Sequence, residues 1–285
     1  ILITGASSGI GLALAQQCQA LGHQVLVTAR KPADLERLQA QGFITYMLDV
    51  TDQTQIQQMF ATISEHFSGI DLLINNAGYG AMGPVLDTNA EVLQQQFATN
   101  VFAIAHVSRA ALPLLLRNQG VIANVGSVSA VVTTPFAGVY CASKAAVHAL
   151  TEAMRMELQP LGVKVVLIQP GAIATGFADT ASQGLRHWLA ADSPWQSFAA
   201  GIAARARASA QNPTSADKFA SQVLAKLLSA APPSVIAAGN GSRSLVWLKW
   251  LLPRALLDRI LQKRFGLRLM FKQLAFGKIV PKSVK

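Results

Sequence analysis

Residues 1–11 have the sequence Ile-Leu-Ile-Thr-Gly-Ala-Ser-Ser-Gly-Ile-Gly, in which an apolar run passes directly into a glycine-rich loop. Apolar residues at helical spacing follow over residues 10–21. Glycines between a strand and a helix allow a tight turn and a close backbone approach to a pyrophosphate. The free N–H groups at the start of the helix, with the positive end of its dipole, favour phosphate binding. The stretch therefore predicts a dinucleotide-binding turn, and the alternative is an ordinary strand–helix turn.

Six further apolar runs of strand length follow the first, and helix-length segments separate them. The runs are continuous rather than alternating, as expected for strands that are buried on both faces of a sheet. The seven strands are expected at residues 1–4, 24–28, 44–48, 71–75, 120–125, 164–169 and 234–238, with helices at 10–21, 54–66, 90–117 and 139–161. This repetition predicts an α/β fold built on a doubly wound, parallel, seven-stranded Rossmann-type sheet.

The composition favours a folded chain with a large core, because 51% of the 285 residues are hydrophobic and 13% are charged. We expect one domain over residues 1–240 and a basic, amphipathic helical extension over residues 241–285. Cys18 and Cys141 supply no disulfide framework, so a reducing, cytoplasmic location is expected. The five histidines lack ligand spacing, so no metal site is predicted. A few residues are expected to precede Ile1, and no stretch resembles a signal peptide.

The net charge of +10 lies entirely in the C-terminal extension. Residues 1–240 hold 13 Lys/Arg and 13 Asp/Glu, whereas residues 241–285 hold 11 Lys/Arg and one acid. No nucleic-acid motif accompanies the charge, so nucleic acid is not an expected partner. Residues 244–271 mix Trp247 and Trp250 with cations, and Lys249 and Pro253 interrupt the stretch, which is too short and too charged to span a bilayer. Two interpretations stay open: peripheral contact with an anionic membrane, or packing on the body with solvated cations.

The end of the second strand indicates which dinucleotide the chain prefers. A fold that prefers NAD places an acid there for the ribose 2′-hydroxyl, but residues 28–31 are Thr-Ala-Arg-Lys. Arg30 is expected to pair with the 2′-phosphate of NADP(H), the alternative being a solvated surface charge. Asp49 and Val50 follow the third strand, where the adenine would lie, and the alternative for Asp49 is a helix cap.

Tyr140 and Lys144 are four residues apart at the start of a predicted helix, so both face the same side. A free tyrosine has a pKa of about 10, and a neighbouring ammonium is expected to lower it. Tyr140 would then exchange a proton with a carbonyl or an alcohol. Ser127 follows the fifth strand, at the carboxyl edge of the sheet, where its hydroxyl would hold the substrate oxygen.

The chain resembles the short-chain dehydrogenase/reductase family. The resemblance rests on six pieces in order: residues 4–11, Asn-Asn-Ala-Gly at 75–78, Asn100, Ser127, Tyr-Cys-Ala-Ser-Lys at 140–144 and Pro-Gly-Ala-Ile-Ala-Thr at 170–175. It spans about residues 1–238 and looks closest to the branch of 17β-hydroxysteroid and retinol dehydrogenases and acyl-dihydroxyacetone-phosphate reductases. It implies a nicotinamide-dependent oxidoreductase.

The resemblance also implies roles for individual residues. Asn100 would anchor a water that links Lys144 to solvent, although a helix cap is the alternative. The catalytic residues would be Asn100, Ser127, Tyr140 and Lys144. The residues that bind NADP(H) would be Gly5, Ser7, Ser8, Gly9, Ile10, Gly11, Arg30, Asp49, Val50, Asn76, Ala77, Gly78, Tyr140, Lys144, Pro170, Gly171, Ile173 and Thr175.

Residues 175–212 lie where this family carries its substrate lid. The lid is rich in large apolar residues, which either wall a pocket or pack into the body: Phe177, Leu185, Trp188, Leu189, Trp195 and Phe198. We expect reduction of a lipophilic aldehyde or ketone, such as a fatty aldehyde, retinoid, steroid or lipid ketone. The alternative is a non-catalytic NADP(H)-binding sensor or scaffold. The helices around residues 103–117 and 147–158 would pair in a homodimer, as in relatives.

Overall fold

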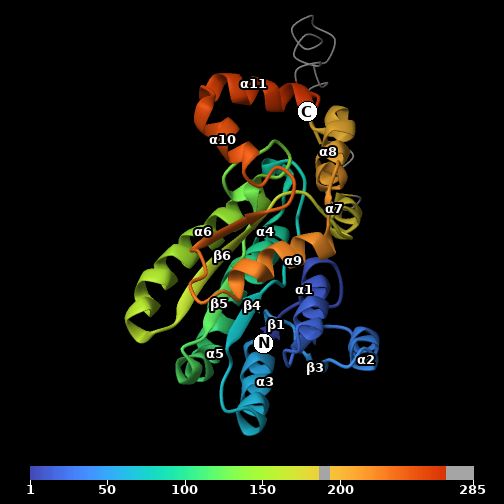
Figure 1. The fold of residues 1–285 in the computed structure, drawn as a ribbon. Coiled ribbons are helices and arrows are strands. Elements are labelled where there is room, and N and C mark those ends of the chain that lie inside the picture. The colour runs from blue at the N-terminus through green and yellow to red at the C-terminus, as the bar shows by residue number, and fades with distance from the viewer. Residues whose placement is uncertain (186–192, 268–285) are drawn as a thin grey trace, which may run out of the picture.

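The computed structural model describes residues 1–185 and 193–267, whose core is one parallel sheet (Figure 1). Its seven strands lie in the order β3-β2-β1-β4-β5-β6-β9, and every pairing is parallel. Their bounds are β1 Leu2–Ile3, β2 Leu26–Ala29, β3 Ile44–Met47, β4 Leu72–Asn75, β5 Val121–Val125, β6 Lys164–Pro170 and β9 Val235–Ala238. The predicted fold class and all seven expected strands are confirmed.

Neighbouring residues of a strand point into two different cores, which explains the continuous apolar runs. Leu2 packs with helices α3 (Gln53–His66) and α5 (Ala103–Asn118), and residues of α6 (Gly138–Leu158) border this cluster. The next residue, Ile3, packs with α1 (Gly9–Ala20), α2 (Pro32–Ala40) and α9 (Ala216–Leu227). Both residues are 0% exposed. The sheet is therefore the middle of three layers, as a doubly wound fold requires.

The helix predicted over residues 90–117 is confirmed, but it is not α-helical throughout. It consists of α4 (Ala90–Phe97), a π-helical segment (Ala98–Phe102) and α5. By length and composition, Ala90–Asn118 is the one stretch of the described residues that could cross a membrane, but half of its most apolar window is buried. Burial against the sheet is a sufficient reason for its apolar character.

A second, two-stranded sheet joins the two ends of the lid. Strand β7 (Ile173–Ala174) pairs in parallel with β8 (Thr214–Ser215), and the lid helices α7 (Phe177–Leu185) and α8 (Ala199–Ala206) lie between them in sequence. Asn240, after β9, adds two hydrogen bonds: its N–H donates to Thr214 Oγ1 at 3.0 Å and its side chain to Asn212 O at 2.8 Å. Two-residue strands carry no detectable period, so the sequence did not predict this sheet.

The described part of the C-terminal extension forms two helices rather than one amphipathic element. Helices α10 (Ser244–Leu251) and α11 (Arg254–Arg264) are separated at Pro253, which has no N–H to continue the first helix. Phe265, just after α11, is buried against Phe136 and Ile202 of the body. By contrast, Trp247 and Trp250 on α10 are 61% and 79% exposed. The end of α11 therefore packs on the body, whereas α10 presents aromatic side chains to solvent.

Candidate active site

A cavity of about 680 Å³ opens at the carboxyl edge of the sheet. The segments that follow β1, β4, β5 and β6 line it, together with the lid and the described part of the C-terminal extension. The strand order reverses between β1 and β4, and ligands of open α/β sheets bind at such a point. A smaller cavity of about 320 Å³, at the opposite edge, gathers no comparable set of reactive groups.

The glycine-rich loop has the shape that the sequence predicted. Gly5 and Gly9 have φ values of +64° and +58°, which disfavour any residue with a side chain. Gly11 is needed for a different reason, because a Cβ there would lie 2.4 Å from Asn76 Nδ2 and 2.6 Å from Gly5 O. The Asn76 amide donates to the carbonyls of Thr4 and Gly5, each at 2.9 Å. Asn76 therefore fixes the loop from the end of β4.

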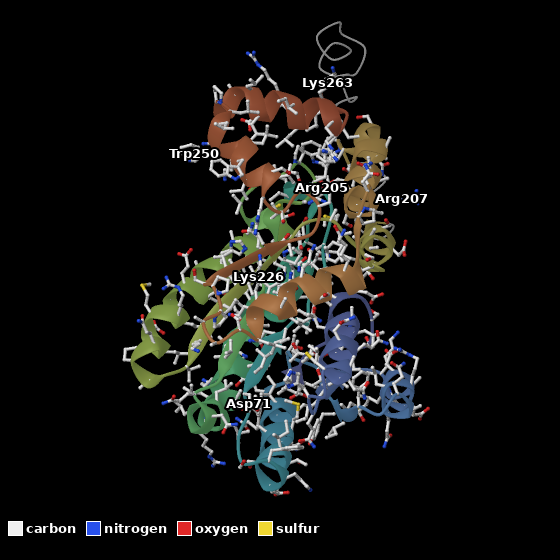
Figure 2. The ribbon with its side chains drawn as sticks, viewed as in Figure 1. Asp71, Arg205, Arg207, Lys226, Trp250 and Lys263 are labelled. Carbon is white, nitrogen blue, oxygen red and sulfur yellow. The ribbon has the colours of Figure 1, made fainter. Side chains whose placement is uncertain are left out.

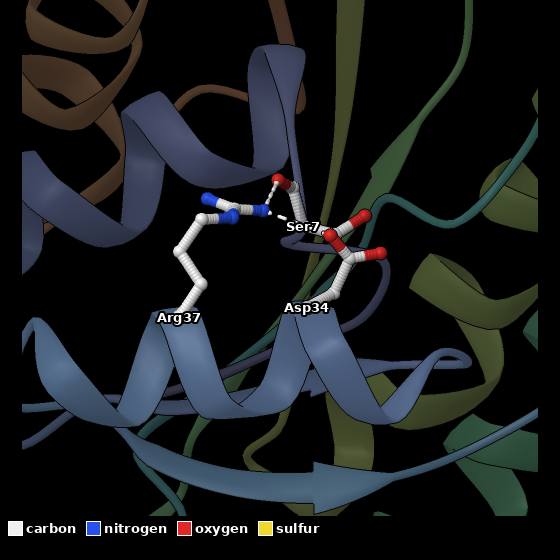
Figure 3. Close-up of polar contacts among 3 residues, drawn as sticks. All are labelled: Ser7, Asp34 and Arg37. Atoms are coloured by element: carbon white, nitrogen blue, oxygen red, sulfur yellow. Dashed lines mark hydrogen bonds and ion pairs between the residues drawn. The ribbon is translucent and has the colours of Figure 1, made fainter.

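A contact that the sequence did not reveal supports the same loop from α2 (Figure 3). The Arg37 guanidinium donates to Ser7 O at 2.6 Å and pairs with Asp34 at 3.0 Å. Asp34, in the first turn of α2, is the first acid in the sequence after β2. Its carboxylate is already paired with Arg37. Arg30 itself is exposed, lines the cavity and lies close enough to Tyr79 to lower the pKa of that phenol, which burial raises.

Asp49 lines the cavity and does not cap a helix. Its carboxylate accepts from the Thr51 N–H at 2.9 Å and from the Thr51 hydroxyl at 2.7 Å. The cap of α3 is Asp52, which accepts from the N–H groups of Thr54 and Gln55. The helix-cap alternative for Asp49 is therefore wrong.

Tyr140 and Lys144 lie in the first turns of α6, and both side chains are buried beside the cavity. The Lys144 ammonium donates to Val125 O at 2.7 Å, and burial lowers the pKa of Lys144 to about 8. Burial raises the pKa of Tyr140, while a hydrogen bond with Ser127 and the charge of Arg205 oppose that rise. The net lowering expected from Lys144 is wrong for this structure, because the ammonium is directed to the β5 carbonyl and desolvation dominates.

Ser127 follows β5 and begins a short 3-10 turn, Val128–Ala130. Its hydroxyl accepts from the Ser129 N–H at 3.0 Å, which holds the side chain beside Tyr140. The arrangement brings a phenol, a hydroxyl and an ammonium to one wall of the cavity. Chemically, such a set is able to hold a substrate oxygen and to supply it with a proton.

Asn100 lies in the π-helical segment and does not cap a helix; the cap of α4 is Asn89. Its side chain accepts from the Tyr79 N–H at 3.1 Å, and its amide donates to Tyr79 O at 2.9 Å and to Ser143 Oγ at 3.1 Å. Asn100 thus joins the segment after β4 to α6. Of the residues predicted for the site, only Asn100 and Gly11 do not line the cavity.

Comparisons with known proteins agree with this geometry. Residues 1–186 match the family model for short chain dehydrogenases. The chain belongs to the short-chain dehydrogenase family. The uncharacterized oxidoreductase YbbO of Escherichia coli K12 is 34% identical over 267 residues, covering 92% of this chain and 93% of YbbO. A 3-ketodihydrosphingosine reductase of Bacteroides thetaiotaomicron is 38% identical over 181 residues, 63% of this chain and 65% of the reductase.

Among solved structures, a short-chain dehydrogenase/reductase of Burkholderia phymatum in complex with NAD has a TM-score of 0.72 and 25% identity, covering 99% of this chain and 97% of that one. The family assignment makes this chain an oxidoreductase with a nucleotide-binding fold. The roles of individual residues in this short-chain dehydrogenase stay predictions.

Two residues of the site escaped the sequence analysis. His148 lies on α6 one further turn after Tyr140 and Lys144, a spacing that would have found it. Its Nε2 accepts from the Ser127 N–H at 3.4 Å, and burial, with the charge of Lys144, lowers its pKa to about 4. The other missed residue, Arg205 on α8, lines the cavity and is 6% exposed. No local pattern places an α8 side chain beside Tyr140.

The lid of this short-chain dehydrogenase uses its aromatic residues in two ways. Phe177 lines the cavity, and its ring centroid lies 5.4 Å from that of Tyr140. Trp195 and Phe198 pack on Phe136 instead, with centroids 6.3 and 6.5 Å away. Part of the apolar set therefore walls the cavity, and another part packs into the body of the protein. Trp188 and Leu189, with the side chain of Leu185, lie outside the described residues.

The two cysteines in the described part of the chain are free and buried. Among residues 1–185 and 193–267, no group of three or more His, Cys, Asp or Glu is placed so that it could hold a metal ion.

Proposed function

We propose that the chain is an NADPH-dependent carbonyl reductase in which Tyr140 is the general acid. The observation that carries the proposal is a single cavity that joins the glycine-rich loop to Ser127, Tyr140 and Lys144. The catalytic domain would comprise residues 1–240, and the residues predicted for the cofactor all line or underlie this cavity.

The residues present fit a nicotinamide dinucleotide. A Cβ at Gly5 would collide with Ala77, and one at Gly11 with Asn76 and the Gly5 carbonyl, so the loop packs closely on the segment after β4. A glycine loop that packs in this way at the start of a helix is the form that binds a pyrophosphate. Arg30, exposed at the end of β2, would take the 2′-phosphate, and Asp49 would meet the adenine. Asp34, the alternative acid for a 2′-hydroxyl, is engaged by Arg37, which favours NADPH over NADH. The bound cofactor would supply the hydride.

The chain's own residues would supply orientation and the proton. The Ser127 hydroxyl would hold the carbonyl oxygen, and Tyr140 would transfer its phenolic proton to that oxygen. With the hydride that bound NADPH would supply to the carbonyl carbon, the carbonyl compound would become an alcohol, and a phenolate would remain on Tyr140. Lys144 stabilises that phenolate until solvent returns the proton, and Asn100 keeps the segment at Tyr79 in place beside α6. Phe177 shields the phenol from water.

The substrate would be a lipophilic aldehyde or ketone. Apolar side chains from the lid and the C-terminal extension line the same cavity as Tyr140: Phe177, Leu245, Leu261 and Phe265. The Bacteroides relative, named a reductase of 3-ketodihydrosphingosine, supports a long-chain ketone.

The test is NADPH oxidation with a panel of aldehydes and ketones of increasing chain length, with Tyr140→Phe as the control. We expect turnover by the native chain and almost none by the variant. NADPH binding without turnover of any carbonyl would instead favour the sensor or scaffold.

We further propose that α10 contacts anionic lipid from the cytoplasmic side. Trp247, Trp250 and Leu251 are exposed on this helix, which contains no acid. The Lys249 ammonium donates to Val131 O, so the aromatic side chains would make the contact. A homodimer through α5 and α6 is the second proposed assembly, since Leu116 and Met156 are exposed apolar side chains on those helices.

A further inference from the structure

Arg205 is a buried cation within the proposed substrate cavity. Its side chain is 6% exposed and lines the cavity, and Figure 2 shows it on the side of α8 opposite Arg207. Its Nε donates to the Thr134 hydroxyl, and the groups that act on it electrostatically include Tyr140 and Cys141. The guanidinium therefore shares the cavity with Tyr140 and lies close enough to that phenol to affect its pKa.

Within the described part of the chain, no acid forms an ion pair with this cation. The one ion pair among residues 1–185 and 193–267 joins Arg37 to Asp34, at the other side of the fold. A guanidinium stays protonated in proteins and has five N–H donors. Thr134 and Cys141 are its side-chain hydrogen-bond partners, which leaves donors for a ligand. An unpaired buried charge is costly, so folds retain one chiefly where a ligand supplies the opposite charge.

A second cation stands close by. Arg264, at the end of α11, is exposed, lines the same cavity and donates to Gln211 Oε1 at 3.1 Å. Burial lowers the pKa of Arg205, and the charge of Arg264 contributes in the same direction, so the two guanidinium groups repel each other across the cavity. An anion between them would remove that repulsion and accept the free N–H donors of both.

We propose that Arg205, with Arg264 at the rim, binds an anionic group of the substrate, so that the substrate is an amphiphilic carbonyl compound with a carboxylate or phosphate. The anionic end meets the guanidinium pair, and the aliphatic part lies along Phe177, Leu245 and Leu261. This inference rests on the proposed function, because it names the class of carbonyl compound that Tyr140 would reduce. A planar guanidinium fork suits both oxoanions, and the experiment distinguishes them.

The test compares matched substrates. One pair is an ω-oxo fatty acid and its methyl ester of equal chain length; the other is a keto-alkyl phosphate and its dimethyl ester. We expect the native enzyme to prefer one anionic member by roughly 10- to 100-fold in kcat/KM, the effect of a charge-assisted hydrogen bond. The preferred pair identifies the oxoanion.

Arg205→Met should abolish this preference, so that kcat/KM for the anionic member falls to about that for its ester; any effect of the lost charge on Tyr140 acts on both members of a pair alike and leaves their ratio unchanged. Arg205→Lys, which keeps the charge but not the fork, should fall between them. Arg207→Met is the matched control, since Arg207 is exposed at the end of the same helix, and it should keep the preference. If Arg205→Met does not fold, Arg264→Met gives the same comparison from an exposed position, with a smaller loss.

A binding measurement separates this inference from the proposed reduction. Calorimetry with nonanoate or an alkyl phosphate, neither of which is reducible, should show an affinity for the native enzyme that Arg205→Met loses and Arg207→Met keeps. If Arg205→Met loses anion binding while the native enzyme reduces no carbonyl compound, the anion site is retained and the proposed reductase activity is overturned. Equal loss of activity on neutral and anionic substrates in Arg205→Met would overturn the anion site, and would assign Arg205 to tuning the Tyr140 pKa.

The test also covers pairing of the guanidinium with an acid of the lid. Asp192 is outside the described residues, and Asp192→Asn tests it directly. Under the proposal, this variant leaves the preference for anionic substrates in place. A large gain in nonanoate affinity on removal of Asp192 would overturn it, because the native guanidinium would then already be paired.

Discussion

The carboxyl edge of the sheet and the lid with its adjoining helices face each other across one cavity, but they are built differently. At the sheet edge, the backbone conformation defines the cavity wall. Gly5 and Gly9 have positive φ values, and the Asn76 side chain holds the loop by two hydrogen bonds. On the lid side, single side chains such as Phe177 and Arg205 define the wall. Changes at the edge should therefore affect every substrate alike, whereas changes in the lid should alter which substrate is accepted.

The largest expected effect is at Tyr140. Tyr140→Phe removes the proton donor and should lower kcat by roughly 100- to 10,000-fold for all carbonyl substrates. Because the ring still packs against Phe177, the cofactor affinity should hardly change. Steady-state kinetics with cofactor fluorescence titration measure both. A variant that kept native kcat would remove Tyr140 from the chemistry.

The next effect concerns the cofactor. Arg30→Ala should weaken NADPH binding by roughly 10- to 100-fold, because a charge-assisted contact with the 2′-phosphate is lost, and should leave NADH binding nearly unchanged. Titration of each cofactor, with Lys31→Ala as the neighbouring control, measures this. Equal losses for NADPH and NADH would contradict the cofactor preference.

A glycine substitution tests the rigidity of the sheet edge. Gly11→Ala forces a Cβ to within 2.4 Å of Asn76 Nδ2 and 2.6 Å of the Gly5 carbonyl. It should destabilise the fold by about 1–3 kcal/mol and weaken cofactor binding. Gly22→Ala is a control without steric contact, although its positive φ costs something on its own. Denaturant unfolding compares the free energies of unfolding of the two variants. Equal values would show that the loop accommodates the added Cβ without strain.

His148 predicts a dependence of stability on pH. The unfolded chain takes up a proton on this histidine near its ordinary pKa of about 6.5, whereas the folded chain resists protonation down to about 4. Its contribution to stability is thus full above pH 6.5 and falls as the pH drops through that window. Unfolding of the native chain and of His148→Gln from pH 7.5 to 4 should give curves that differ in slope only there. Parallel curves would remove His148 as the cause.

The smallest effect is expected on the outer surface of α10. Replacing Trp247 and Trp250 by serine should reduce sedimentation with vesicles that contain phosphatidylserine, and should leave kcat unchanged. Vesicles of neutral phosphatidylcholine are the control for charge. No difference between the native chain and the double variant on anionic vesicles would discard the membrane contact.

Much of the sheet edge was predictable, because its signals are local. Each βα turn places its residues next to a strand end, and parallel strands bring those ends to one edge, so Gly5, Ser127 and Tyr140 could be assigned together. The lid was not predictable in this way. Its strand pair, Ile173–Ala174 with Thr214–Ser215, is too short for a period, and it joins residues about forty positions apart.

The sequence by itself determined the seven strands, the dinucleotide loop and the Tyr140–Lys144 pair, because hydrophobic period and helical spacing are properties of neighbouring residues. Only the tertiary structure decided the direction of the Tyr140 pKa shift, since desolvation depends on everything that covers a group. It also decided that Arg205, from a helix sixty-five positions later, lies beside that phenol. Proximity between distant segments arises from packing, and no local pattern records it.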